Sequence, residues 1–141
     1  VEAVLAAQGY ISARAARAVK SLNAWVTGPD WNTTLPAYSR CVRITRSLTE
    51  VYSVEPERFV ETAEQELYAA LRESEALDRN PGSVDDFLNA FLPLIPYINR
   101  FFDDVLVMAE DESLRNNRLG LLQRIVALAD GAADMSHLEG F

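Results

Sequence analysis

Residues 101–122 read FFDDVLVMAEDESLRNNRLGLL and carry the clearest local folding signals in the chain. An apolar segment ends at the acidic triplet 110–112, after which leucines recur at helical spacing. Asp111 is suited to cap a helix, because its carboxylate can accept hydrogen bonds from the free N–H groups of the first turn. Acidic side chains at that end are also favoured by the helix dipole. The pattern predicts an apolar helix over 97–108 and a long helix from 112 to about 129.

Apolar side chains recur every three or four residues upstream of this stretch as well. They predict a helix over 1–8 and another over 10–26. A third helix is expected to run from Thr33 or Thr34, as N-cap, to about Val51. A fourth should begin at Glu55-Pro56, with Phe59 and Val60 on its apolar face, and a fifth should follow Ser83. Ser83 followed by Asp86 resembles a capping box. No segment of convincing length alternates with a period of two residues. The predicted fold class is therefore all-α, a helical bundle of about six to seven helices.

The length and composition are typical of one domain. A chain of 141 residues, 49% of them hydrophobic, can bury a core without disulfides or metal ions. We expect residues 1–9 to be the end of a preceding segment and residues 10–141 to form the domain. The start at Val1 resembles a cut inside a longer chain more than a signal peptide. No apolar run is long enough to indicate a membrane-spanning helix. The single cysteine, which can form no disulfide within the chain, and the missing signal peptide together favour a cytoplasmic protein.

The formal net charge of −8 is unevenly distributed. Residues 1–46 carry six basic side chains against two acidic ones, whereas residues 47–141 carry seven against nineteen. The bulk charge argues against a simple nucleic-acid binder, because phosphate contacts dominate such affinity. The basic first third could nevertheless meet a polyanion, and its simpler interpretation is a set of solvated helix faces.

The residue types needed for catalysis or metal binding are sparse. Cys41 is the only cysteine and His137, far away in sequence, the only histidine, so neither a reactive thiol nor a zinc site is expected. The acidic pairs 85–86 and 103–104 and the triplet 110–112 offer oxygen ligands, but helix-start or surface roles explain them better. We expect no catalytic and no metal-binding residue in this chain.

The stretch 101–122 also resembles a known family. The pattern FFD-x-V-x-V-M-A-E-D-x-x-L-R-x-N-R-L-x-L-L is similar to the C-terminal end of the β subunit of bacterial-type heterotetrameric glycyl-tRNA synthetase. The similarity continues into Ala133-Asp134-Met135-Ser136 and, upstream, into Arg40-Cys41-Val42-Arg43-Ile44, where Arg43 replaces the family's usual Asn. Residues 94–100 depart from the family pattern. The resemblance extends roughly from Arg14 to Ser136.

This resemblance implies that residues 10–141 are a helical anticodon-binding domain of the DALR type. The family's β subunit pairs with a catalytic α subunit in a heterotetramer and helps to ligate glycine to glycine tRNA. A domain of this kind would recognise tRNA and would not itself be catalytic. The resemblance implies no cofactor in this fragment, ATP and Mg²⁺ in the holoenzyme, a cytoplasmic location, and neither membrane nor DNA as partner.

Unstacked anticodon bases can be read by Arg, Asn and aromatic side chains, which suggests three groups of RNA contacts. They are the row Arg40, Arg43 and Arg46, the group Arg115, Asn117 and Arg118, and the row Arg14, Arg17 and Lys20. Trp25 or Trp31 could stack a base, although core packing is the better explanation for each tryptophan. Arg115 and Arg118 have an alternative as well, which is pairing with Glu112, Asp111 or Asp103 to lock the helix junction.

Two other functions remain open at this point. The acidic segment 47–141 would also suit a helical protein-interaction domain that holds the β subunit to its partner subunit. A stand-alone hydrolase would rest only on the abundance of carboxylates.

Overall fold

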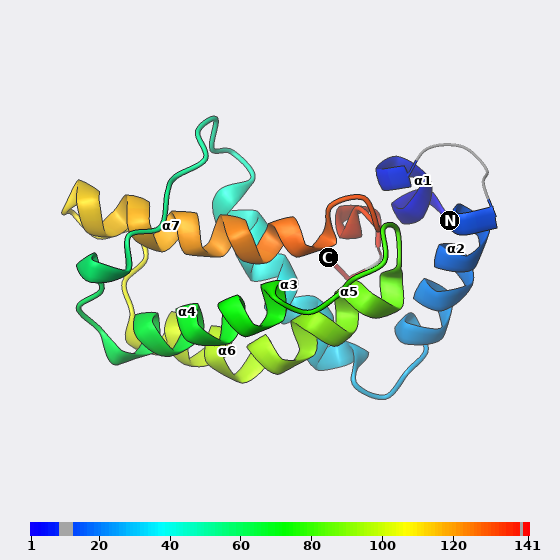
Figure 1. The fold of residues 1–141 in the computed structure, drawn as a ribbon, viewed down its shortest axis with the longest axis horizontal. Coiled ribbons are helices and arrows are strands. Elements are labelled where there is room, and N and C mark those ends of the chain that lie inside the picture. The colour runs from blue at the N-terminus through cyan, green and yellow to red at the C-terminus, as the bar shows by residue number, and fades with distance from the viewer. Residues whose placement is uncertain (9–12, 139) are drawn as a thin grey trace.

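The computed structural model describes residues 1–8, 13–138 and 140–141. Within these ranges the chain is helical and contains no strand, which confirms the all-α prediction. The helices are α1 (Glu2–Gln8), α2 (Ala13–Val26), α3 (Trp31–Thr45), α4 (Thr62–Glu75), α5 (Val84–Phe91), α6 (Ile95–Asp104) and α7 (Glu112–Val126) (Figure 1). Short 3₁₀ turns lie between α3 and α4, between α5 and α6, and after α7. Gly9, Tyr10 and Ile11, expected to end the first helix and begin the second, lie outside the described residues.

The helices pack as a bundle around one apolar core. In Figure 1, α7 runs along the long axis, α4 and α6 run beneath it, and α3 crosses obliquely. Helix α3 packs against α7, α4 against α6, and α2 against α5. Tyr38 of α3 meets Phe87 and Phe91 of α5 edge-on, with ring centroids 5.6 and 5.4 Å apart. The core thus joins segments that are far apart in the sequence.

Helix α1 packs onto the bundle rather than standing apart from it. Ala3 and Val4 are buried, and the carbonyl oxygen of Ala3 accepts a hydrogen bond of 2.7 Å from the backbone N–H of Asp134. Helix α1 contacts α2 and the 3₁₀ turn Met135–His137. The domain boundary near residue 9 stays a prediction.

Helix α3 is shorter at its C-terminal end than predicted. It begins at Trp31 after Asp30, two or three residues before the expected N-cap, and ends at Thr45 instead of near Val51. Residues 51–55 leave the helix and lie extended along α7, where Gly120 approaches the backbone of Tyr52 closely. A Cβ atom at position 120 would lie 2.7 Å from the carbonyl oxygen of Tyr52. This contact joins two segments that are far apart in the sequence, so the local pattern does not show it.

Two further helix ends differ from the prediction. Pro56–Arg58 is a 3₁₀ turn, and α4 starts only at Thr62, so Val60 is exposed rather than on the apolar face. Helix α6 spans Ile95–Asp104 and does not reach Met108, because Val105 takes an extended backbone conformation. The next residue, Leu106, is 70% exposed.

The predicted helix starts at Asp111 and Ser83 are confirmed. The Asp111 carboxylate accepts hydrogen bonds from the backbone N–H groups of Ser113 and Leu114, at 2.8 and 3.3 Å. Ser83 Oγ accepts one of 3.1 Å from the backbone N–H of Asp86. The Asp86 carboxylate does not complete the box, since it accepts from the N–H of Asn80 at 2.7 Å.

Candidate nucleic-acid interface

The first predicted group is exposed to solvent: Arg40 and Arg43 lie on α3, and Arg46 directly follows its last residue, Thr45. The opposite face of the helix is held in the core by Tyr38, Cys41 and Thr45, so the three guanidinium groups must point outward. None of the three forms an ion pair with an Asp or Glu side chain in the described part of the chain. The row is therefore a positively charged strip, which we call the α3 arginine row.

The members of the α3 arginine row differ in their neighbours. The Cζ atom of Arg40 lies 4.2 Å from the centroid of the Phe102 ring of α6. Arg43 donates a hydrogen bond to the carbonyl oxygen of Phe141 and lies near that ring, with 6.0 Å from Cζ to the centroid. For Arg46 the described residues provide no such contact.

The second row, Arg14, Arg17 and Lys20, lies on the exposed side of α2. Ala15, Ala18 and Leu22 hold the other side of that helix in the core. Arg14 and Arg17 line a cavity of about 330 Å³ opposite the 80–85 segment. The structure thus places two of the three predicted groups on exposed helix faces, one on α2 and one on α3.

The third group, Arg115, Asn117 and Arg118, is engaged within the protein. Asn117 is buried, accepts a 2.6 Å hydrogen bond from the backbone N–H of Glu55, and donates a 3.0 Å one to the carbonyl oxygen of Glu55. Arg115 Nη1 donates to the carbonyl oxygen of Ala109 at 3.0 Å. These hydrogen bonds fix loops to α7, which corresponds to the locking alternative considered for the two arginines.

Arg118 forms a buried ion pair with Glu64 of α4. Nε and Nη2 donate to the two carboxylate oxygens at 3.1 and 3.2 Å, while Nη1 donates to the carbonyl oxygen of Leu106 at 2.6 Å. The side chains are only 6% and 0% exposed. The partners expected from sequence, Glu112, Asp111 and Asp103, were wrong, because the true partner lies 54 residues upstream on a helix that packs against α7.

Asn117, Gly120 and Gln123 lie at three-residue spacing on one side of α7 and together bind the extended segment 50–55. Gln123 accepts from the backbone N–H of Tyr52 at 2.9 Å and donates to the carbonyl oxygen of Glu50 at 2.7 Å. This side of α7 therefore forms hydrogen bonds with the backbone of another segment of the same chain. The sequence shows that α7 carries amide side chains, but it does not show which segment of the chain they bind.

Both tryptophans are half-buried at the α2–α3 corner. Trp25 Nε1 donates a 2.7 Å hydrogen bond to the Asp85 carboxylate, which fixes the ring. Trp25 and Trp31 flank a hollow of about 180 Å³ that Gly28, Pro29 and Asp30 also line. They pack partly against the core and keep part of their surface exposed.

The groups considered for catalysis do not converge. Cys41 is fully buried, and burial raises the pKa of its thiol to about 12, so it is a core side chain. His137 lies 3.6 Å from Asp134 and 3.9 Å from Glu2, at the surface. Within the described ranges, no three His, Cys, Asp or Glu side chains come together in a way that could hold a metal ion.

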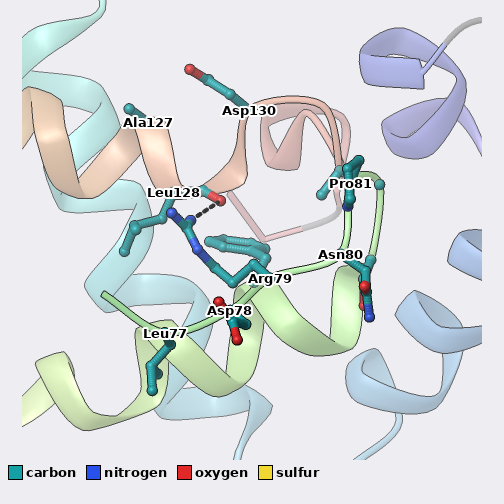
Figure 2. Close-up of a pocket in the computed structure, with 12 residues that line it drawn as sticks. Leu77, Asp78, Arg79, Asn80, Pro81, Ala127, Leu128 and Asp130 are labelled. Atoms are coloured by element: carbon teal, nitrogen blue, oxygen red, sulfur yellow. Dashed lines mark hydrogen bonds between the residues drawn. The ribbon is translucent and has the colours of Figure 1, made fainter. Parts of the chain in front are cut away.

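A separate hollow of about 340 Å³ lies between the 77–83 segment and residues 127–132 (Figure 2). Arg79 crosses it, and Nη1 donates to the carbonyl oxygen of Leu128 at 3.3 Å. Its Nε atom is buried and has no hydrogen-bond partner among the described residues. None of the RNA-contact residues predicted from sequence lines this hollow.

The chain is similar in sequence to one part of several longer proteins. No family model matches it. It is 37% identical over 141 residues to a glycine–tRNA ligase beta subunit of Moorella thermoacetica and 37% identical over 144 residues to one of Anaeromyxobacter dehalogenans. These alignments cover 98% and 99% of the chain but only 20% of each relative. The same subunit of Aquifex aeolicus is 37% identical over 111 residues, which is 78% of the chain and 16% of that relative.

The chain thus spans about a fifth of the length of the curated relatives that it matches. None of the described helices is both long and apolar enough to cross a membrane.

Proposed function

We propose that this chain is the tRNA-binding part of the β subunit of a glycine–tRNA ligase and that it recognises the anticodon region of glycine tRNA. The observation that carries the proposal is the similarity to glycine–tRNA ligase beta subunits, which extends over nearly the whole chain. The all-α fold agrees with the helical domain that the sequence resemblance implies. In this proposal the chain contributes recognition to glycyl-tRNA synthesis in the cytoplasm, and an α subunit contributes the chemistry.

The α3 arginine row is the surface that supports RNA binding best. Its three guanidinium groups are exposed and have no Asp or Glu partner in the described part of the chain. Arginine binds phosphate and base edges through several donors held in one plane. The row Arg14, Arg17 and Lys20 on α2 would extend the contact along the RNA backbone.

Arg115, Asn117 and Arg118 are not part of this proposed surface. Asn117 and Arg118 are buried, and all three bind groups of the protein itself. An RNA contact would require these side chains to abandon those hydrogen bonds, which buried polar groups do only at high cost.

ATP and Mg²⁺, which the family implies for the holoenzyme, do not fit the residues described here. These residues provide no cluster of three metal ligands, and the sequence has no glycine-rich phosphate loop.

A gel-shift titration with glycine tRNA and an anticodon-substituted tRNA, each at two salt concentrations, tests the proposal. We expect tighter binding to the native anticodon and weaker binding at higher salt, because released counterions make phosphate contacts salt-dependent. Arg46→Ala should weaken binding. Arg100→Ala is the matched control, since this exposed arginine is paired with Glu66 at 2.7 Å. Equal affinity for both tRNAs would contradict anticodon recognition.

A docking surface for another protein is the second candidate. Val60, Leu106 and Met108 are all exposed. Val60 and Leu106 belong to one network, because Glu64 accepts from the backbone N–H of Val60 while its partner Arg118 donates to Leu106. Leu106→Ser should then reduce capture of the α subunit in the absence of tRNA, whereas an RNA-binding role alone predicts no effect.

A further inference from the structure

The three positions of the α3 arginine row present their guanidinium groups differently. Arg40 lies over an aromatic ring, Arg43 is tied to a backbone carbonyl, and Arg46 has no comparable contact among the described residues. A residue needed only for its positive charge requires no defined orientation. The position of Arg40 over a ring therefore distinguishes it from Arg46.

The ring beneath Arg40 is anchored in the core. Phe102 is half-buried on α6, and its ring packs edge-on against that of Phe101, with 5.7 Å between centroids and an interplanar angle of 80°. Phe101 is completely buried. Helices α3 and α6 pack against each other, so the ring and the arginine above it are held by two elements of the bundle. The Arg40 Cζ atom lies over the Phe102 ring, while the residue as a whole remains exposed.

We infer that Arg40 and Phe102 form a stacking platform for an unpaired RNA base, with the guanidinium between the phenylalanine ring and the base. A guanidinium plane is a surface on which splayed-out bases stack, and its N–H edges remain available for hydrogen bonds. Bases in a duplex are already stacked, so the platform selects single-stranded nucleotides such as those of a loop. Arg46, by contrast, attracts the RNA phosphates through its charge and does not stack on a base. This inference rests on the proposed RNA-binding function and assigns distinct roles within it.

Binding of a fluorescently labelled anticodon stem-loop of glycine tRNA, followed by anisotropy over a salt series, tests the platform. Arg40→Lys keeps the charge and removes the plane, so affinity should fall roughly five- to tenfold, the lower range for loss of one stacked base. Its salt slope should stay unchanged. The matched variant Arg100→Lys changes an exposed arginine outside the α3 arginine row, one that pairs with Glu66, and should bind within about twofold of the wild type. Arg46→Ala should reduce the salt slope by about 0.7.

Phe102→Leu provides the second arm, because it removes the ring and leaves an apolar side chain in its place. We expect it to weaken stem-loop binding to a similar extent as Arg40→Lys, while circular dichroism melting shows a folded domain. If Phe102→Leu fails to fold, Arg40→Lys still decides the question, because an exposed arginine-to-lysine change leaves the core intact.

The outcomes separate the inference from the function on which it rests. Wild-type binding to the stem-loop with no loss in Arg40→Lys would overturn the platform and leave the proposed function standing. Equal losses in Arg40→Lys and Arg100→Lys would overturn it too, because the loss would then not depend on the position over the Phe102 ring. Absence of any wild-type binding to glycine tRNA or its stem-loop would overturn the proposed function, and the platform with it.

Discussion

Replacement of Arg118 by methionine should destabilise the domain strongly while leaving its proposed RNA surface intact. Arg118 supplies three donors within the bundle, two to Glu64 and one to the carbonyl oxygen of Leu106. In its absence the Glu64 carboxylate stays buried and keeps only the backbone N–H groups of Val60 and Glu61, at 3.2 and 2.9 Å. The variant thus leaves a buried negative charge without a cation.

Removal of one partner of such a pair typically costs about 3–5 kcal/mol of unfolding free energy. The Glu64 side chain is 0% exposed, so solvent cannot replace the arginine without opening the bundle. For a chain of this length the loss corresponds to a fall of roughly 10–20 °C in melting temperature. Thermal melting by circular dichroism measures it directly.

A double variant separates the charge effect from the packing effect. Glu64→Leu combined with Arg118→Met removes both charges, and we expect it to recover most of the stability that Arg118→Met loses. Stem-loop affinity of the folded single variant should match that of the wild type. If Arg118→Met melts within 1–2 °C of the wild type but fails to bind RNA, this reasoning is refuted. Arg118 would then be an RNA-contact residue.

Three smaller perturbations test individual contacts. Gly120→Ala should lower stability by about 1–3 kcal/mol in a denaturant titration, because its methyl group would press on the carbonyl of Tyr52; an unchanged midpoint would contradict the close approach. Asp111→Ala should cost about 1 kcal/mol through loss of the helix cap, and Asp111→Asn, which keeps an accepting oxygen, should cost less in the same melting assay. Cys41 should resist a thiol reagent at mildly alkaline pH until the chain unfolds, because burial raises its pKa to about 12; rapid labelling of the native protein would show that the thiol is accessible.

Features set by neighbouring residues were predictable from the sequence. The caps at Asp111 and Ser83 use hydrogen bonds to backbone N–H groups within three residues, so their signature is contained in a few letters. The buried positions of Leu67 and Leu71 likewise follow from the period of the helix. These parts of the fold depend on no distant segment.

Helix ends that depend on distant contacts were not predictable. Continuous apolar spacing favoured helices through Val51 and Met108, yet the chain leaves both helices early. Segment 50–55 instead binds Asn117 and Gln123 of α7, and Leu106 binds Arg118. No local pattern shows which backbone group a side chain will bind 12 to 73 residues away.

The candidate site was predictable only in part, for the same reason. Exposure of the α3 arginine row follows from the apolar residues on the opposite face of its helix. The burial of Arg118 depends on its ion pair with Glu64, a partner 54 residues upstream that the local sequence does not identify. Phe102 was visible as half of an apolar pair, but its place beneath Arg40 depends on how α6 crosses α3.

A hydroxyl-radical footprint of glycine tRNA bound to this chain tests the central claim most directly. The account predicts protection of the anticodon arm, with protection lost when Arg40, Arg43 and Arg46 are replaced together by alanine. Protection confined to the acceptor stem, or an anticodon-arm footprint that the triple variant leaves unchanged, would contradict it.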